Sequence, residues 1–187
     1  MNDKYLILDT STSVQLVILI VSNKIISIQK NVKPKSFVSC MIPLISRTLK
    51  ENNINISQLT KIIVGIGPGS YTGTKVAVLT AKILSLELKI SLYKISSLLL
   101  LTSGYYQSVI TPKVNINNSD SYALSLVNGQ IILPEDRYTQ KFLTQFQYHI
   151  LLNEEKNLKI ALDKLFDYIE EVKDPHYLVP NYCCPVY

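Results

Sequence analysis

Short runs of aliphatic and β-branched residues open the chain and predict strands. Residues 5–8 form an apolar run that ends at an aspartate, and two further runs cover residues 14–21 and 25–28. The triplet Ser22-Asn23-Lys24 between the second and third runs has the composition of a turn. We therefore expect three consecutive antiparallel strands at the start of the chain.

Two longer stretches repeat apolar residues at helical spacing. The triplet Pro34-Lys35-Ser36 is a start signal for a helix that ends near residue 51, with its serine as the N-cap. Pro43 lies inside this helix, where a proline costs about 3 kcal/mol, so tertiary packing must hold it there. A second helix is predicted over residues 71–88, after a short buried strand at 62–66.

Beyond residue 88 the pattern predicts mostly strands. Ser96 or Ser97 can cap a short helix through Leu101, and Asn128-Gly129 is the strongest hairpin turn in the chain. The runs that alternate or are apolar throughout predict strands at residues 90–95, 109–116, 122–127, 130–133 and 148–152.

One further helix is predicted near the end of the chain, over residues 154–172. Its apolar residues recur three or four positions apart, which is the spacing of a helix face. These residues are Leu158, Leu162, Leu165, Phe166 and Ile169.

The order of these elements predicts the fold class. Three strands followed by alternating helices and strands (β-β-β-α-β-α-β-α) is the order of the actin-like, ribonuclease-H-like (ASKHA) lobe, an α/β fold with mixed sheets and flanking helices. The remainder of the chain is smaller and less regular. We therefore expect an N-terminal lobe over residues 1–104, which carries two long helices, and a reduced C-terminal lobe over residues 105–187.

Charge and cysteine usage narrow the function classes. The chain has 19 basic and 14 acidic residues, a formal net charge of +5, but the basic residues form no run, so net charge alone does not favour direct nucleic-acid binding. The three cysteines, Cys40, Cys183 and Cys184, form no C-x-x-C pair, which predicts reduced thiols without a disulfide or zinc site. No apolar run is long enough to span a bilayer, and we expect a cytoplasmic protein without a membrane partner.

The stretch GIGPGSYTGTKVAV at residues 65–78 concentrates glycine after a strand and before a helix. Its glycines, Gly67, Gly69 and Gly73, match neither the dinucleotide pattern nor the P-loop pattern. Backbone N–H groups here could converge on an anion at the helix N-terminus. Alternatively, Gly69 serves a tight turn, Ser70 or Thr72 caps the helix and Gly73 permits close packing. The spacing leaves both interpretations open.

A turn at the end of the first strand raises the same question. Asp9-Thr10-Ser11-Thr12 resembles the phosphate-and-magnesium hairpin of actin-like ATPases, in which a glycine follows the acid. The side chains of Thr10 and Ser11 would crowd a phosphate here, and Asp9 could equally accept N–H groups of its own turn. An actin-like ATPase or small-molecule kinase therefore remains an alternative. Its vestigial nucleotide contacts would be Asp9, Thr10, Gly67, Gly69, Ser70 and Gly73.

The helix predicted over residues 71–88 is apolar on two sides. One side can face the sheet of its own lobe, while the other needs a neighbouring helix or another chain, and periodicity does not separate these cases. The candidate partner-interface residues are Val76, Leu79, Ile83 and Leu86 on this helix, with Phe37, Met41, Leu44, Ile45 and Thr48 on the first helix.

No catalytic residue and no metal ligand is predicted. His149 and His176 lie too far apart in the sequence to form a pair at local spacing. The residues around Ser70 do not match the G-x-S-x-G nucleophile elbow, so a peptidase has no residues to carry its chemistry.

Three segments together resemble the TsaB (YeaZ) family, the dimerisation subunit of the bacterial machinery that makes threonylcarbamoyladenosine next to the tRNA anticodon. They are residues 6–19, 65–84 and 95–98, and the glycine loop is the most specific because the family is known by G-P-G-S-[FY]-T-G-x-[RK] at this place. The resemblance covers residues 4–102 well. Beyond them the chain departs from the family: Val179 stands where an arginine is usual, and Asn115-Ile116-Asn117 lacks the charges of the family's Asp-Ala-Arg.

The resemblance implies an inert accessory subunit. It would bind a TsaD-like ATPase through helices 36–51 and 71–88, with a TsaE-like ATPase in the wider complex, and would meet tRNA through that complex. It would need no cofactor of its own, because ATP and a metal belong to the partner: residues 93–98 lack the His-x-x-x-His of TsaD. A homodimer of the free chain and a tRNA-binding module, the latter supported by net charge alone, remain alternatives.

Overall fold

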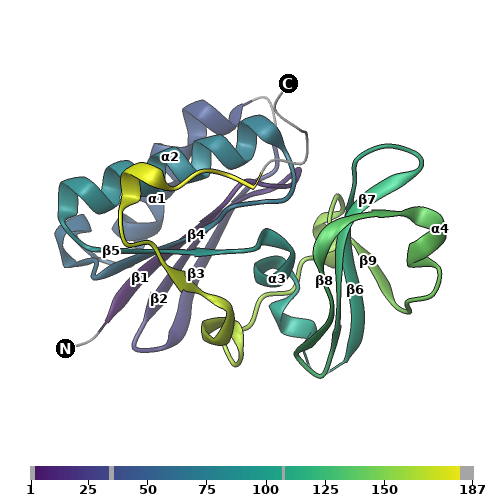
Figure 1. Cartoon of the computed structure of the whole chain (residues 1–187). Coiled ribbons are helices and arrows are strands. Elements are labelled where there is room, and N and C mark those ends of the chain that lie inside the picture. Colours follow the sequence, from purple (N-terminus) through teal and green to yellow (C-terminus); the bar gives the residue numbers. More distant parts are fainter. Residues whose placement is uncertain (1–2, 34–35, 107, 182–187) are drawn as a thin grey trace.

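The computed structural model describes residues 3–33, 36–106 and 108–181, which form two lobes (Figure 1). The first lobe contains a six-stranded sheet in the order β10-β5-β4-β1-β2-β3, and the second contains a four-stranded sheet in the order β8-β7-β6-β9. Both sheets are mixed. Among the described residues, we find no helix with the length and apolar character that crossing a membrane requires.

The three predicted opening strands are confirmed, and they form half of the first sheet. β1 pairs antiparallel with β2 and parallel with β4, so its inner position buries both faces and explains its continuous apolar run. The strands of this sheet are β1 (Lys4–Asp9), β2 (Gln15–Val21), β3 (Lys24–Asn31), β4 (Lys61–Gly65), β5 (Ser91–Ile95) and β10 (Glu170–Glu171).

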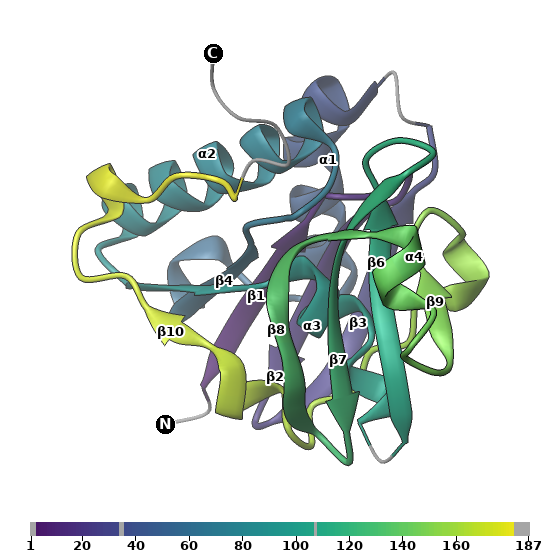
Figure 2. The ribbon, with the colours of Figure 1, turned by 45° about the vertical axis from the view of Figure 1, so that its right-hand side comes forward.

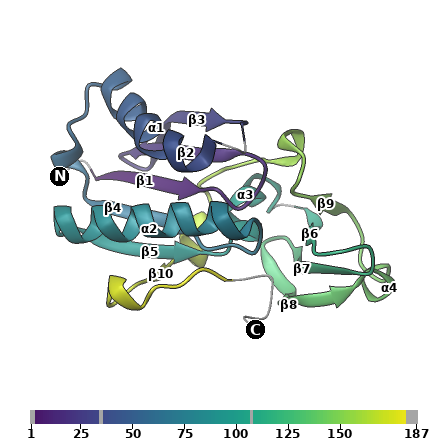
Figure 3. The same ribbon diagram turned by 90° about the horizontal axis from the view of Figure 1, so that it is seen from above.

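The two predicted long helices are confirmed, and in the structure both cover one face of the first sheet (Figure 3). α1 (Phe37–Glu51) keeps Pro43 on its exposed side, and α2 (Tyr71–Leu88) ends at Lys89 in the left-handed conformation. Ser36 occupies the N-cap position of α1, but its hydroxyl donates to the Lys33 carbonyl instead of capping the helix. The rest of the predicted start signal, residues 34 and 35, lies outside the described residues.

The second lobe contains the predicted meander. Asn128 and Gly129 both have positive φ at the β7–β8 turn, which confirms the hairpin signal. Ser96 caps α3 (Ser97–Leu101), which leads into this lobe, by accepting from the Leu98 N–H group. The other elements are β6 (Val109–Asn115), β7 (Asp120–Val127), β8 (Gln130–Thr139), α4 (Gln140–Leu143) and β9 (His149–Leu151).

The prediction of a helix over residues 154–172 is wrong. This segment contains only short 3-10 turns, Glu155–Asn157 and Leu165–Tyr168, and strand β10. Its backbone bonds to the α3 region instead, because Lys159 donates to the Leu101 carbonyl at 2.9 Å and accepts from Gly104 N–H at 2.8 Å. The apolar side chains that suggested a helix face pack against the hydrophobic core between the lobes.

The two lobes share that core. One buried cluster joins Ile7 and Ile18 of the first sheet to Ile110, Leu126 and Leu165 of the second half of the chain. The predicted division at residues 104 and 105 therefore needs a correction. The end of the chain returns to the first lobe, because β10 pairs with β5 and the following residues run beside α2 (Figure 2).

Candidate functional site

Asp9 lies buried at the end of β1, where both of its carboxylate oxygens are occupied by hydrogen bonds from the same chain. Oδ1 accepts from the Ser11 N–H group at 2.9 Å and from the Ser11 hydroxyl at 2.7 Å, while Oδ2 accepts from the Ser97 hydroxyl at 2.5 Å. Gly65 approaches the same carboxylate so closely that a Cβ there would lie 1.9 Å from Oδ2. Of the two interpretations that the sequence leaves open for Asp9, this geometry supports the one in which the carboxylate accepts an N–H group of its own turn.

Burial raises the pKa of the Asp9 carboxyl above its ordinary value of 3.8, although the hydrogen bonds from Ser97 and Ser11 oppose this rise. The folded chain therefore retains a proton at pH values where the unfolded carboxyl has lost it. It follows that the Asp9 contribution to the free energy of unfolding falls as pH rises from the ordinary pKa to the raised one.

We predict that Asp9→Asn removes this pH dependence, because an amide does not titrate and can still accept from Ser11. Urea unfolding at several pH values between about pH 4 and pH 7 measures the slope. Asp163→Asn at an exposed position should keep the slope of the unmodified chain. An equal slope in Asp9→Asn and the unmodified chain would show that Asp9 does not cause it.

The glycine loop packs directly against the turn that follows Asp9. A Cβ on Gly69 would lie 2.0 Å from the Ser11 carbonyl oxygen, and a Cβ on Gly73 would lie 2.0 Å from the Thr10 carbonyl oxygen. Ser70 N–H donates to the Ser11 carbonyl at 2.6 Å. These glycines are thus needed where one backbone meets another, and the close-packing interpretation of Gly73 is supported by geometry.

Further loop groups bond within the chain. The Ser70 hydroxyl caps α2 by accepting from the Gly73 N–H group at 3.2 Å. The Gly67 N–H group donates to the Ser97 hydroxyl at 2.9 Å, and the backbone of Gly67 has a positive φ of +94°. Thr10 is fully buried, and its Oγ1 has no hydrogen-bond partner among the described residues. The structure thus brings the six predicted contact residues together, and nucleotide contact at them stays a prediction.

Two residues that the sequence did not single out cover this loop. Asn181 N–H donates to the Ile66 carbonyl at 2.6 Å, and a Cβ on Gly67 would lie 2.7 Å from the Asn181 carbonyl oxygen. Glu135 of β8 accepts from the side chains of both Asn181, at 2.8 Å, and Ser96. Burial raises the pKa of the Glu135 carboxyl, against those two hydrogen bonds. No local pattern marks these contacts, because they join segments that are distant in sequence.

The outer face of α2 is apolar and exposed, which is the arrangement expected if another chain covers the second apolar side of this helix. Leu79 is 58% exposed and Ile83 is 51% exposed, Leu86 is exposed as well, and Val76 is half-buried. The opposite side of the helix, with Ala77, Val78 and Ala81, packs against the sheet.

The α1 half of the predicted interface needs a correction. All five predicted residues are buried within their own lobe: Phe37, Met41, Leu44, Ile45 and Thr48. Of these, Ile45 lines the groove between α1 and α2. α1 instead exposes Val38, at 70%, and Ile42. These two residues lie in the rows next to the buried face, and a helical-wheel analysis that first assigned the sheet-facing side could have found them.

A groove of about 440 Å³ separates α1 from α2, and Ile42, Leu49 and Leu84 are among its lining residues. Of the exposed aliphatic residues on the two helices, Ile42 lines this groove. We call the outward-facing aliphatic residues of the two helices the helix face; they are Val38, Ile42, Val76, Leu79, Ile83 and Leu86.

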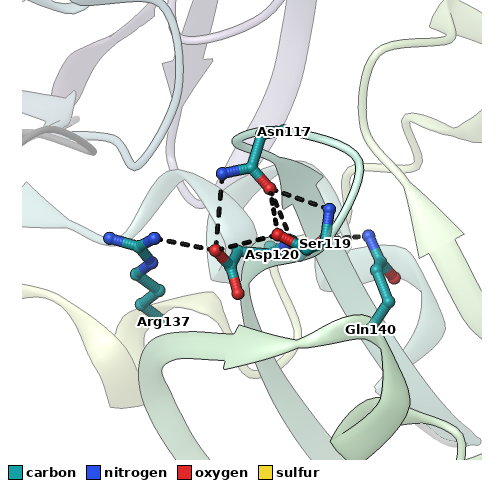
Figure 4. Close-up of polar contacts among 6 residues, drawn as sticks. Asn117, Ser119, Asp120, Arg137 and Gln140 are labelled. Atoms are coloured by element: carbon teal, nitrogen blue, oxygen red, sulfur yellow. Dashed lines mark hydrogen bonds and ion pairs between the residues drawn. The ribbon is translucent and has the colours of Figure 1, made fainter.

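A polar cluster closes the β6–β7 loop of the second lobe (Figure 4). Asn117 Oδ1 accepts from the backbone N–H groups of Ser119 and Asp120, both at 2.8 Å, and Asp120 forms an ion pair with Arg137 at 2.7 Å. The hydrogen bond from Arg137 lowers the pKa of the Asp120 carboxyl. These contacts hold a hairpin loop, and Asn117 is part of the segment in which the family's charges are missing.

Possible metal ligands are dispersed. Within residues 3–33, 36–106 and 108–181, no group of three or more histidine, cysteine, aspartate and glutamate residues could hold a metal ion. His149 Nε2 lies 3.0 Å from the carbonyl oxygens of both Leu143 and Phe146. Cys183 and Cys184 lie outside the described residues.

Sequence comparisons relate the chain to proteins of tRNA modification. Residues 20–114, just over half of the chain, match the family model described as TsaD, tRNA N6-adenosine threonylcarbamoyltransferase. The tRNA threonylcarbamoyladenosine biosynthesis protein TsaB of Buchnera aphidicola subsp. Schizaphis graminum is 32% identical over 54% of this chain and 48% of its own length. The TsaB protein of Buchnera aphidicola subsp. Baizongia pistaciae is 23% identical over 92% of this chain and 72% of its own length. The chain thus spans about half of the first relative.

Two solved structures share the fold. YeaZ from Pseudomonas aeruginosa aligns with a TM-score of 0.65 and 22% identity, over 73% of this chain and 67% of its own. A protein described as similar to peptidase YeaZ from Pseudomonas aeruginosa aligns with a TM-score of 0.75 and 18% identity, over 96% and 99% of the two chains. Together with the family-model match, these likenesses confirm the predicted actin-like, ribonuclease-H-like fold class.

Proposed function

Because the chain belongs to the TsaD family that the matching model defines, and within it to the TsaB/YeaZ proteins, we propose that it acts in the biosynthesis of threonylcarbamoyladenosine in tRNA. Its role there is that of a non-catalytic subunit that binds a TsaD-like ATPase. A TsaE-like ATPase and tRNA join through the assembled complex. The site of action is the cytoplasm.

The helix face is the observation that carries this proposal. Large aliphatic side chains such as Leu79 and Ile83 are exposed to solvent on a helix whose other side is packed in the core. Each square ångström of apolar surface that a partner removes from water contributes about 25 cal/mol, and a contiguous apolar patch is typical of a protein-binding site. A helical partner surface of similar apolar character would therefore bind here.

The non-catalytic role is supported by the site around Asp9. Its carboxylate accepts hydrogen bonds from Ser11 and Ser97, and Gly69 and Gly73 are in contact with backbone atoms of the turn that follows Asp9. In this proposal the chain needs no cofactor, and the ATP and metal of the reaction are bound by the TsaD-like subunit. The actin-like ATPase alternative has less support, because a bound phosphate would have to replace these internal contacts of Asp9 and the loop.

Co-expression tests the proposal directly. The full chain, produced with an affinity-tagged TsaD-like subunit, should co-purify with that subunit. Light scattering of the purified sample should give the mass of a stoichiometric complex. In a bacterial strain depleted of its own TsaB-like subunit, the chain and its cognate partner should restore threonylcarbamoyladenosine, measured by mass spectrometry of tRNA nucleosides. A chain that neither co-purifies nor restores the modified nucleoside does not have this role.

A further inference from the structure

The second lobe contains two adjoining pockets that lie apart from the helix face. Tyr105 and Ser108 line both, so the two pockets are neighbours. The larger one, of about 560 Å³, is mostly apolar and aromatic, and its other lining residues are Val109, Ile110, Tyr148, His149 and Ile150. The smaller one, of about 280 Å³, is more polar and has Lys159, Asp163 and Lys164 in its wall. We call the two neighbouring pockets together the cleft; one part is aromatic and the other contains the lysines.

The side chains of both lysines in this cleft pack directly against a glycine. A Cβ on Gly104 would lie 2.4 Å from Lys159 Cγ, and a Cβ on Gly129 would lie 3.1 Å from Lys164 Cδ. The Lys159 backbone bonds to Leu101 and Gly104, and Lys164 Nζ donates to the Asn128 carbonyl at 3.3 Å. Both side chains are exposed, so their ammonium groups remain in contact with solvent.

The aromatic part of the cleft offers flat surfaces beside these charges. Tyr148 is 69% exposed, and its carbonyl accepts from Thr111 N–H at 3.0 Å, which fixes the backbone at the wall. Tyr105 is half-buried, and Lys159 Nζ lies 5.0 Å from the centre of its ring. Asp163 is the acidic side chain of the polar pocket, and the two lysines outnumber it.

A planar ring linked to an anionic group is the ligand that matches this arrangement. Aromatic side chains stack on bases of any sequence, and lysines neutralise phosphates. We propose that the cleft binds a nucleotide unit of single-stranded RNA, with the base against Tyr105 and Tyr148 and a phosphate at Lys159 and Lys164. That the ligand is RNA and not a free nucleotide rests on the proposed function in tRNA modification.

Fluorescence anisotropy of the full chain with a labelled single-stranded RNA octamer of mixed sequence tests this site. Lys159→Gln with Lys164→Gln should weaken binding about tenfold and lower the slope of log affinity against log salt by about 0.7, which is the contribution of one single-strand phosphate contact. The matched control, Lys24→Gln with Lys141→Gln, removes the same charge from exposed lysines elsewhere. An equal loss in the control pair would overturn the site, because binding would then reflect net charge alone.

The aromatic contact has a separate readout. Tyr148→Ala should weaken RNA binding about tenfold through lost stacking while leaving the salt slope unchanged, and Tyr148→Phe should bind as the unmodified chain does. Unchanged affinity in Tyr148→Ala, or no binding of RNA by the unmodified chain, would overturn the proposal. AMP that competes as strongly as the octamer would overturn the assignment to RNA.

Co-purification separates this proposal from the proposed function. The lysine and Tyr148 variants should bind the TsaD-like subunit as the unmodified chain does, because the cleft and the helix face do not share residues. Loss of RNA binding with retained co-purification is the expected result. A chain that binds RNA through the cleft but never binds a TsaD-like subunit would contradict the proposed function and leave the cleft in place.

Discussion

Aspartate at both Leu79 and Ile83 should abolish the complex with the TsaD-like subunit and the tRNA modification that depends on it. Both side chains are more than half exposed in the free chain and lie on the outer face of α2. A charge that is buried in an interface without a partner costs about 3–5 kcal/mol, so we expect at least a thousandfold loss of affinity from the pair. Titration calorimetry with the purified subunit measures the loss, and nucleoside mass spectrometry measures its consequence.

Two control variants make this result specific. Ile132→Asp replaces another exposed aliphatic residue, 54% exposed on β8, and should leave partner binding unchanged. Met41→Asp places a charge at a buried α1 position and should unfold the chain, because that position faces the sheet. If Leu79→Asp with Ile83→Asp binds the partner as tightly as Ile132→Asp does, the helix face is not the interface.

Gly73→Ala should destabilise the chain by about 3 kcal/mol or more, because the added Cβ would lie 2.0 Å from the Thr10 carbonyl oxygen. The obstacle is backbone, so relief requires α2 to move away from the turn at the end of β1. For a chain of this size each kcal/mol lowers the melting temperature by about 2–4 °C, which predicts a fall of roughly 6–12 °C. Differential scanning calorimetry measures it.

The neighbouring position is the matched control for this steric effect. Thr72→Ala changes an exposed residue in the same turn of α2 and should alter stability by less than about 0.5 kcal/mol. Without the close approach, alanine at position 73 would stabilise the helix by up to about 1 kcal/mol through its higher propensity. A melting temperature that rises or stays constant in Gly73→Ala would therefore contradict the packing of the loop against the turn.

The site around Asp9 was only partly predictable. The sequence points to Asp9, Ser70 and the loop glycines because an aspartate after a strand, a serine before a helix and closely spaced glycines are local signals. For Ser97 the sequence indicates only a possible cap, whereas in the structure its hydroxyl bridges Asp9 and Gly67. Glu135 and Asn181 carried no signal, because an isolated carboxylate and amide in irregular sequence have many possible partners.

The helix near the end of the chain shows how periodicity misleads. Leu158, Leu162 and Leu165 have helical spacing, yet their segment crosses between the lobes and bonds to the backbone near α3. Most of the stability of a helix in a protein comes from tertiary packing of its apolar face, so tertiary contacts override a weak local preference. Tertiary contacts also override the predicted helix at residues 170–171, which form β10 and pair with β5 at the edge of the first sheet.

The sequence by itself determined the order of the strands and long helices in the first lobe, the β7–β8 hairpin and the presence of two apolar sides on α2. These features depend on residues close together in the chain, whose periodicity and turn chemistry act locally. Only the tertiary structure decided that α1 buries its predicted interface residues, that the glycines accommodate the Thr10 and Ser11 carbonyls, and that the end of the chain covers the loop. Each of these depends on which distant surface meets a given face, and periodicity describes a face without identifying its partner.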